Sequence, residues 1–174
     1  ERAGLPVPPA MAAELAALLP TITSRSADTA VEVIVANGDP DDPTLDRLTD
    51  RHPCVRWVSS PPGRGRQMNA GAALASGRWL LFLHADTRLT SGWIDEIQAT
   101  DPVKDVIGGA FRFTLDSPRR FARIIEWGVA WRVRWLGLPY GDQAVFARRV
   151  AFDAVGGYRC LELMEDVDFV RRLR

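Results

Sequence analysis

Cysteine is scarce in this sequence, and long apolar runs are lacking. The two cysteines, Cys54 and Cys160, are too few and too far apart to predict a disulfide framework or a metal cage. No run approaches the roughly 18 apolar residues of a transmembrane helix. The first residues also lack the charged and then apolar pattern of a signal peptide. We therefore expect a cytoplasmic protein.

An excess of charge of either sign is also missing. The 174 residues contain 22 basic and 22 acidic side chains, and Lys104 is the only lysine. This balance predicts neither a nucleic-acid binder nor an acidic-surface protein. With 47% hydrophobic residues, the length suits one domain over residues 1–174. Such a domain buries roughly 70% of the surface that its unfolded chain exposes.

An apolar run that ends in polar residues is the strongest signal present. Residues 79–83 are all apolar, which is typical of a short strand buried on both faces in the middle of a sheet. His84 and Asp86 follow at its carboxyl end, where ligands of open α/β sheets bind. Asp86 is therefore well placed to hold a metal and a phosphate. A role as a simple turn cap is equally open for it.

A second predicted strand, residues 31–36, runs into an acidic loop. Nearly every residue of 37–44 is a turn former, and several are acidic. Asp42 or Thr44 can cap a helix that begins near Pro43. The other interpretation is that this loop contacts a nucleotide.

A third predicted strand, residues 55–58, leads into residues 61–77, where glycines alternate with arginines before an alanine-rich helix. Helix amino termini offer free N–H groups, and Arg64 and Arg66 can form forked hydrogen bonds to phosphate oxygens. The pattern suits a diphosphate but matches neither the P-loop nor the dinucleotide glycine spacing. A flexible loop with solvated arginines is the alternative.

Three further elements follow from local pattern. We expect a helix over residues 10–19 that ends at Pro20, because proline lacks the N–H group that helices need. A second helix is predicted over 91–97. Residues 106–115 suit a strand weakened by the pair Gly108-Gly109.

A tryptophan stripe marks the helix predicted over residues 121–136. Trp127, Trp131 and Trp135 are four residues apart and therefore share one face, while arginines occupy other faces. An aromatic stripe at this spacing is typical of a core-facing helix. Tryptophan combined with arginine also occurs at membrane surfaces, so peripheral membrane contact through these three residues is the second interpretation.

Two polar segments close the sequence. Residues 138–149 read as a polar turn that leads into a short apolar strand, and residues 164–174 as a helix. Glu165 and Asp166 lie in the first turn of that helix, where its dipole favours carboxylates. They suit either helix caps or a functional site.

In their order, these motifs resemble the family 2 glycosyltransferases with the GT-A fold. The resemblance rests on Asn-Gly-Asp, Arg-x-Gln-Met-Asn-Ala-Gly, Leu-Phe-Leu-His-Ala-Asp-Thr, Gly-Asp-Gln, and Gly-Gly-Tyr with Met-Glu-Asp. It covers residues 31–174 and is greatest to a small bacterial subgroup with His-Ala-Asp in place of Asp-x-Asp. It implies a Rossmann-like three-layer α/β sandwich with a mixed, mostly parallel central sheet.

The resemblance also implies site residues. The nucleotide-sugar site would consist of Asn37, Asp39, Arg64, Arg66, Asn69, Gly71, His84, Ala85 and Asp86. The acceptor side would consist of Tyr140, Gly141, Asp142 and Gln143. Glu165 and Asp166 would form the catalytic pair, with Asp166 as general base. Asp86 would bind Mn²⁺ or Mg²⁺; whether His84 ligates the metal weakly, bonds a phosphate or does neither stays open.

The implied activity is inverting transfer of a sugar from a nucleoside-diphosphate sugar to an acceptor hydroxyl. Three features depart from the family, the first of which is His84 in place of the first metal carboxylate. The expected first strand is missing or diverged in residues 1–20, and Asn37 stands where the family has an acidic residue. These departures favour one alternative, a non-catalytic domain that binds a nucleotide or a partner. A nucleotidyltransferase on a related α/β sheet is a second alternative. The acceptor is not readable, and the location is cytoplasmic or peripheral to the inner face of the membrane.

Overall fold

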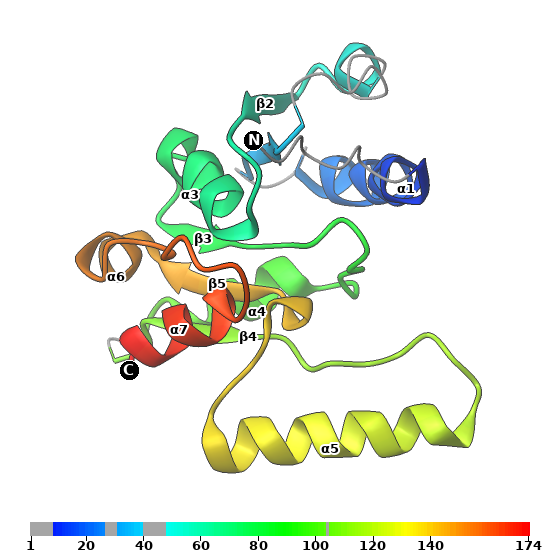
Figure 1. Ribbon diagram of the computed structural model, residues 1–174, viewed down its shortest axis with the longest axis vertical. Helices are drawn as coiled ribbons and strands as arrows, with labels where there is room; N and C mark the ends of the chain where they lie inside the picture. The colour runs from blue at the N-terminus through cyan, green and yellow to red at the C-terminus, as the bar shows by residue number, and fades with distance from the viewer. Residues whose placement is uncertain (1–8, 27–30, 40–47, 104) are drawn as a thin grey trace.

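The computed structural model describes residues 9–26, 31–39, 48–103 and 105–174, which form a mixed α/β structure with two small sheets (Figure 1). In the first sheet, β1 (Val33–Asn37) and β2 (Val55–Ser59) pair in parallel. Both strands lie where the apolar, β-branched runs predict them. Their parallel register places both carboxyl ends, Asn37 opposite Ser59, at the same edge.

The second sheet has the order β3–β5–β4 and is antiparallel. β3 (Trp79–Leu81) forms from the apolar run that the sequence marks most strongly, and β5 (Val145–Arg148) lies in the centre. β4 is short and spans Gly108–Ala110. Among the strands of the described residues, parallel pairing is thus confined to β1 and β2, while the sheet that carries β3 is antiparallel.

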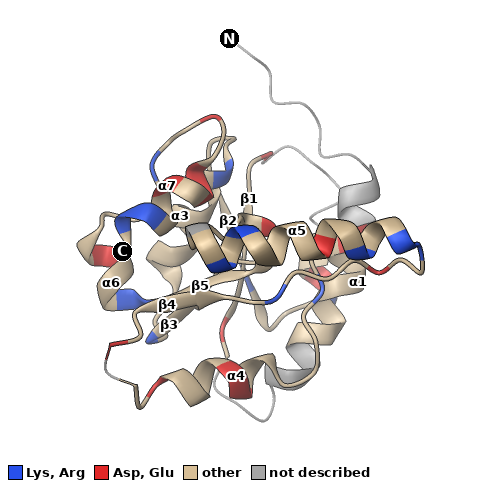
Figure 2. Ribbon diagram, turned by 90° about the horizontal axis from the view of Figure 1, so that it is seen from below, with Lys and Arg blue, Asp and Glu red and all other residues tan. Residues whose placement is uncertain are grey.

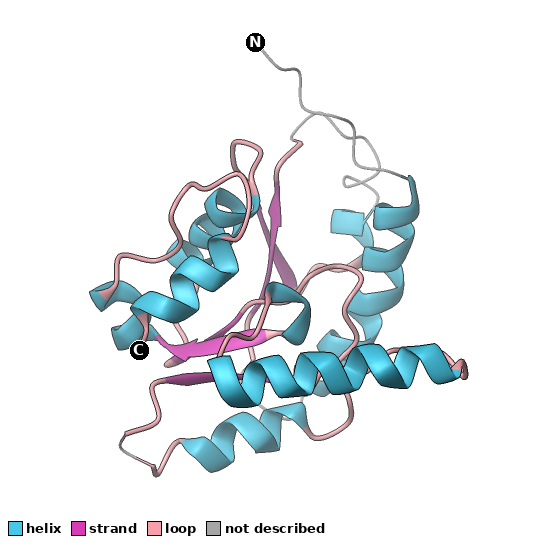
Figure 3. Ribbon diagram, turned by 60° about the horizontal axis from the view of Figure 1, so that its bottom comes forward, coloured by secondary structure: helices cyan, strands magenta, loops and turns pink. Residues whose placement is uncertain are grey.

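Helices cover both faces of the second sheet (Figure 3). Their bounds are α1 (Pro9–Ser26), α3 (Arg64–Leu74), α4 (Trp93–Thr100), α5 (Arg120–Leu136), α6 (Arg149–Ala154) and α7 (Glu165–Arg172). Residues of α3, α6 and α7 join one hydrophobic cluster on one face, and residues of α4 join a second cluster on the other. α5 lies along one side of the molecule, joined to the sheet by loops at both its ends (Figure 1).

Alternation along β3 and β5 divides the side chains between these two clusters. Val145 and Ala147 face the α3, α6 and α7 cluster, whereas Phe146 faces α4. In the same way, Leu80 joins the first cluster and Leu81 the second. Successive strand residues point to opposite faces, so apolar residues at every position mean that both faces are covered. The prediction of a strand covered on both faces is confirmed for Trp79–Leu81. Its expected place in the middle of a sheet is wrong, because β3 lies at the edge of its sheet and pairs with β5.

The predicted strand over residues 106–115 is wrong in extent, because only Gly108–Ala110 pairs. The glycine pair is not a weak point but the paired segment itself. A Cβ atom on Gly108 would lie 2.7 Å from the Phe146 carbonyl oxygen, and one on Gly109 would lie 2.7 Å from the Phe146 ring. β4 therefore approaches β5 at a distance that only glycine permits.

The prediction that the first helix ends at Pro20 is also wrong. α1 continues from Pro9 to Ser26 with Pro20 inside it. Leu18 and Leu19, the two residues before the proline, are buried with exposed fractions of 5% and 0%. The Thr21 hydroxyl donates a hydrogen bond to the Leu18 carbonyl at 2.7 Å. Packing of the turn around Pro20 thus outweighs the local cost of the missing N–H group.

The expected helix start near Pro43 lies outside the described residues, as do Asp42 and Thr44. Cys54 and Cys160 are free and exposed. Among the residues described, no helix combines the length and apolarity needed to cross a membrane.

Candidate active site

His84 and Asp86 lie in a turn that directly follows the buried end of β3. The Phe82 N–H group donates to the Val145 carbonyl at 2.9 Å, which extends the pairing with β5 by one residue. Thr87 N–H then donates to the His84 carbonyl at 3.0 Å and closes the turn. Within this turn His84 is half-buried and Asp86 is exposed. The two side chains therefore meet different surroundings.

Asp166 lies at the start of α7 and is held by two backbone N–H groups. One carboxylate oxygen accepts from Val167 N–H at 2.8 Å, and the other accepts from Gly141 N–H. These bonds fix the carboxylate against the short 3₁₀ helix η1 (Gly141–Gln143). The first turn of α7 thus brings a carboxylate to a glycine that lies 25 residues earlier in the chain.

Gly141 is the point where three segments converge. A Cβ atom at this position would lie 2.6 Å from His84 Nε2 and 3.4 Å from an Asp166 carboxylate oxygen. The absence of a side chain is what allows His84 to approach the turn. His84, Gly141 and Asp166 therefore form one constellation, built from the end of β3, from η1 and from the start of α7.

Asp142 adds a second carboxylate beside this constellation. Desolvation raises the pKa of Asp142, and the nearby negative charge of Asp166 raises it further. Arg132 and His84 act in the opposite direction on the pKa of the same carboxyl. The four side chains are thus close enough to influence one another's charge. A carboxyl group whose pKa is shifted by desolvation and by specific charged neighbours is typical of catalytic sites.

Arg132 of α5 contacts the segment that leads into the turn with Gly141 and Asp142, and holds it in place. Its guanidinium carbon lies 3.4 Å from the centroid of the Tyr140 ring, and Nε donates to the Leu138 carbonyl at 3.2 Å. The side chain of Gln143 accepts from Tyr140 N–H at 3.2 Å and donates to the Phe111 carbonyl at 3.3 Å. The buried Gln143 therefore has a structural part in holding the turn.

The rings of Tyr158, Phe169 and Phe82 pack together next to Asp166, and this cluster is called the aromatic floor. Tyr158 stacks on Phe169 with 4.3 Å between ring centroids and meets Phe82 edge-on at 5.0 Å. Burial raises the pKa of Tyr158, and Asp166 and Glu165 add to the increase. The Tyr158 hydroxyl therefore stays neutral, and the carboxylates rest on a rigid, apolar support.

Backbone strain is concentrated around the same place. Ala144 and Met164 are the two non-glycine residues with positive φ in the described part of the chain, at 49° and 63°. Ala144 follows η1, and Met164 precedes α7. Non-glycine residues in this region are uncommon and cluster at functional sites, where the surrounding structure maintains the strain.

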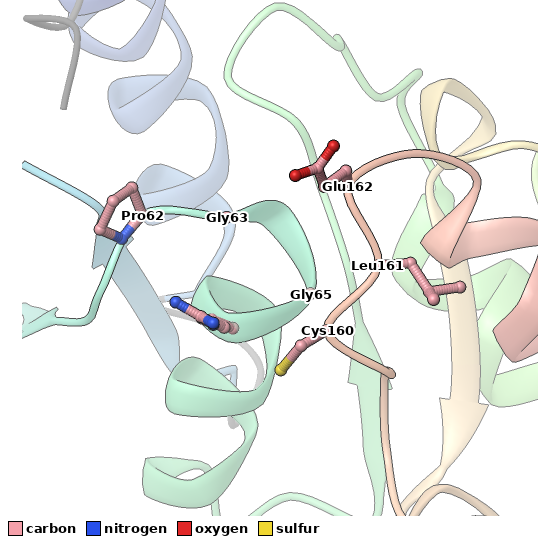
Figure 4. Close-up of a pocket in the computed structure, with 7 residues that line it drawn as sticks. Pro62, Gly63, Gly65, Cys160, Leu161 and Glu162 are labelled. Carbon is pink, nitrogen blue, oxygen red and sulfur yellow. The ribbon is translucent and has the colours of Figure 1, made fainter. Parts of the chain in front are cut away.

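A hollow of about 210 Å³ lies between the amino end of α3 and the loop that precedes α7 (Figure 4). Its lining consists of Pro62, Gly63, Gly65, Arg66, Cys160, Leu161 and Glu162. Gly63, the N-cap of α3, has no side chain to bond the first N–H groups of the helix. The glycine- and arginine-rich segment thus presents a helix amino terminus to a hollow.

Glu165, which precedes Asp166, lies next to the start of α3. It is buried with an exposed fraction of 3%, and its carboxylate lies 3.9 Å from the exposed guanidinium of Arg64. Gly65 packs so tightly against the loop that a Cβ atom there would lie 2.6 Å from the Arg159 carbonyl oxygen. The start of α3 and the start of α7 are therefore held next to each other.

Asn69 and Gly71, expected to line the nucleotide pocket, make structural contacts. The Asn69 amide donates to the Tyr158 carbonyl at 2.8 Å and accepts from Tyr158 N–H at 2.9 Å. Gly71 faces β1, because a Cβ atom on it would lie 3.9 Å from Ala36 and Ile34. Gln67, which the sequence does not single out, donates to the Ala36 carbonyl at 3.1 Å. α3 is thereby fixed between the first sheet and the aromatic floor.

Asn37 and Asp39 form a turn at the end of β1. The Asn37 side chain accepts from Asp39 N–H at 2.8 Å and donates to the Asp39 carbonyl. Such self-bonding is the usual way in which asparagine stabilises a turn. The same turn packs against α3, because a Cβ atom on Gly38 would lie 3.0 Å from the Gln67 side chain.

A divalent metal ion needs several ligands from side chains, phosphates or water. Within the described ranges, no three His, Cys, Asp or Glu side chains gather as a metal site. Mg²⁺ nevertheless uses only one or two protein carboxylates when phosphates and water supply its other ligands. The exposed Asp86 carboxylate fits an ion that arrives with a diphosphate. His84 instead faces Gly141 and Asp166.

Comparison with known proteins gives one decisive match: the profile of "Glycosyl transferase family 2" matches residues 11–162. The chain belongs to this family. The GT-A fold expected from the sequence motifs is therefore confirmed, with its parallel and antiparallel strand pairs. None of the curated proteins that were compared matches the chain.

For a family 2 glycosyltransferase chain, the structure gathers part of the expected site in one place. It brings together His84, Gly141, Asp142 and Asp166, with Glu165 and Arg64 next to them. Asp86 and Ala85 occupy the adjoining turn after β3. Sequence reasoning missed Arg132 and Tyr158 as supports of the site. The Gly-Gly-Tyr motif directly before Met-Glu-Asp was the available signal for Tyr158.

Proposed function

We propose that this chain transfers a sugar from a nucleoside-diphosphate sugar to an acceptor hydroxyl, with inversion at the anomeric carbon. The observation that carries the proposal is the convergence of His84, Gly141 and Asp166 beside the amino end of α3. Membership of glycosyl transferase family 2 supports glycosyl transfer in general. The finer assignments below rest on the geometry of the individual side chains.

Asp166 is proposed as the general base that removes the proton of the acceptor hydroxyl. An ionised carboxylate offers about four lone-pair positions, of which backbone N–H groups of Gly141 and Val167 occupy two. Lone pairs therefore remain for the acceptor. Because the two backbone bonds fix its orientation, the carboxylate needs little reorganisation during the reaction. General base catalysis of this kind typically contributes roughly 10²- to 10⁴-fold.

The diphosphate of the donor is assigned to the amino end of α3. Free N–H groups at a helix start bind phosphate oxygens, and Arg64 and Arg66 supply positive charge there. Asp86 would hold Mn²⁺ or Mg²⁺ on the same diphosphate. When bound, the ion would neutralise charge that develops on the departing nucleoside diphosphate.

Inversion follows from the use of a single displacement. The acceptor oxygen forms its bond to the anomeric carbon as the bond to the nucleoside diphosphate breaks, and the acceptor proton passes to Asp166. One base and one displacement leave the new bond on the opposite face of the sugar. In this proposal Tyr140 and Asp142 surround the position of the incoming hydroxyl, and the buried Gln143 holds their turn in place.

The test measures release of nucleoside diphosphate and formation of glycosylated product, using UDP- and GDP-sugars with candidate acceptors. Asp166→Asn should lower the rate at least 100-fold, while Asp153→Asn, which changes an exposed carboxylate on α6, should leave it unchanged. Undiminished transfer by Asp166→Asn would overturn the assigned base. Release of pyrophosphate instead would favour a nucleotidyltransferase.

Metal dependence is tested by calorimetric titration of UDP, GDP and their sugar conjugates, first with Mn²⁺ and then with EDTA. We expect binding that requires the ion and is lost in Asp86→Ala. Because Asp86 is exposed, the variant should keep the unfolding midpoint of the parent chain. If a folded parent chain binds no donor, the non-catalytic alternative replaces the proposal.

A further inference from the structure

The outward face of α5 is apolar, although nothing in the described chain covers it. Its large apolar side chains are exposed to between 39% and 71%, and they are Phe121, Ile124, Ile125, Trp127, Trp131 and Trp135. These six side chains make up half of the large apolar residues that the described structure leaves exposed. Monomeric soluble proteins rarely expose so many in one place, so such a face marks an interaction surface.

The inward face of the same helix carries smaller and more polar residues. Ala122 is buried, Val129 and Val133 are half-buried, and Glu126 accepts from Leu115 N–H at 2.7 Å. α5 therefore turns its small side chains toward the protein and its tryptophans toward solvent. The core interpretation of the tryptophan stripe is wrong, because these three rings lie on the opposite side of the helix from the buried Ala122.

Positive charge borders the apolar face. In Figure 2, arginines lie near both ends of α5. Arg120 and Arg134 are exposed, and neither forms an ion pair within the described residues. The one acidic residue of the helix, Glu126, has a side chain that is only 14% exposed and pairs with Arg123 at 3.0 Å. The outward face thus combines tryptophan with unpaired arginine and lacks negative charge of its own.

We propose that α5 docks in the plane of an anionic phospholipid surface, with the tryptophan stripe inserted at the level of the headgroups. Tryptophan is suited to that depth because its ring is apolar while its N–H group can stay hydrated. The arginines extend to the lipid phosphates while their apolar stems stay near the acyl chains. With 17 residues, the helix presents a flat contact about 25 Å long.

Charge complementarity favours this occupant over a second copy of the chain. A two-fold dimer through α5 would bring the same surface of each copy together, so the arginine borders would face each other without acidic partners. An anionic bilayer supplies the missing negative charge. The proposal uses no residue of the His84–Gly141–Asp166 constellation and does not depend on the transferase assignment.

The experiment is co-sedimentation of the chain with two kinds of vesicle, phosphatidylcholine alone and phosphatidylcholine with phosphatidylglycerol. We expect binding to the anionic vesicles that is at least tenfold tighter and weakens as salt rises. The triple variant Trp127→Ser, Trp131→Ser, Trp135→Ser should lose binding at least tenfold. Arg120→Gln with Arg134→Gln should remove the preference for anionic vesicles.

A matched control removes three exposed apolar side chains from separate segments. The triple variant Val103→Ser, Val150→Ser, Leu163→Ser changes residues that are 48%, 73% and 78% exposed and should bind vesicles like the parent chain. Equal loss in both triple variants, or no vesicle binding by the folded parent chain, would overturn the proposal. A dimer that the tryptophan variant dissociates, without vesicle binding, would assign the face to a second copy instead.

Discussion

α7 and α5 are both amphipathic helices, yet they meet opposite surroundings. The apolar side chains of α7 are buried against the sheet, with Val167, Phe169 and Val170 exposed by 5%, 0% and 8%. The tryptophans of α5 are exposed by at least 51%. Spacing of apolar residues therefore indicates that a helix has one apolar face, but it does not indicate what covers that face.

The two helices are also held in different ways. α7 is fixed by ring packing of Phe169 on Tyr158 and Phe82. α5 is held largely by polar contacts with its own flanking loops, since Arg123 donates to the Leu115 carbonyl at 2.8 Å and Arg132 to the Leu138 carbonyl at 3.2 Å. Apolar burial thus stabilises α7, which carries Asp166, whereas polar contacts position α5.

The largest expected effect tests this difference directly. Phe169→Ala should lower the free energy of unfolding by about 3–5 kcal/mol, because it opens a cavity in the ring cluster. Trp131→Ala on α5 removes a larger ring but should cost less than about 0.5 kcal/mol, because the side chain is exposed. Urea unfolding of both variants measures the contrast. Equal losses would mean that α5 contributes to the core.

A smaller effect is expected where α3 meets the aromatic floor. Asn69→Ala leaves the Tyr158 N–H and carbonyl groups without their partner, which should cost about 1–3 kcal/mol. Asn69→Asp keeps an acceptor for the N–H group but loses the donor to the carbonyl. Its unfolding midpoint should therefore lie between those of Asn69→Ala and the parent chain. A midpoint equal to that of the parent would show that the donated bond contributes nothing.

Arg132 joins the exposed helix to the site, and Arg132→Lys tests that connection. Lysine keeps the positive charge but cannot reproduce the guanidinium contacts to Tyr140 and Leu138. Under the proposed function, we expect a roughly tenfold lower turnover, equal to about 1.4 kcal/mol, from looser positioning of the turn. Unfolding of the variant should shift little. Unchanged turnover would show that the contacts of Arg132 do not affect the rate of the reaction.

The smallest effect concerns the pH dependence of stability. The pKa of Asp142 is raised above its ordinary value of 3.8, so the folded protein holds this proton more tightly than the unfolded chain. Its stabilising contribution is complete below that value and is lost as pH rises through the folded pKa. Asp142→Asn should thus gain a few tenths of a kcal/mol at pH 7, because the carboxyl is partly exposed, and nothing at pH 3. Paired urea titrations at both pH values measure the difference.

Much of the fold could be predicted because strand signals and helix signals are local. The apolar run at 79–83 and the β-branched run at 31–36 both form strands, and Asp166 lies in the first turn of a helix as its position indicates. Local rules failed where tertiary packing opposes them. Pro20 sits inside a helix, and Gly108 and Gly109 form the pairing segment of β4 because Phe146 leaves no room for a side chain.

The candidate site could be predicted in its residue types but not in its distances. The order of the motifs identifies His84, Gly141 and Asp166. Only the structure shows that His84 can approach Gly141 because glycine has no Cβ atom. Asn69 illustrates a contact that the motif does not predict, since its amide bonds to the backbone of Tyr158. A motif records which residues occur together, and it does not distinguish a contact with a ligand from a contact with the backbone.

The contact of Arg132 with Tyr140 has a thermodynamic consequence for two distant events. One end of this contact belongs to the helix proposed to meet lipid, and the other belongs to the turn that carries Gly141. Any free energy of coupling that passes through it acts equally in both directions. If lipid binding at α5 raises the affinity of the site for a substrate by some factor, that substrate raises the affinity of α5 for lipid by the same factor. A protein with bound substrate would then bind a membrane more tightly than a protein without substrate.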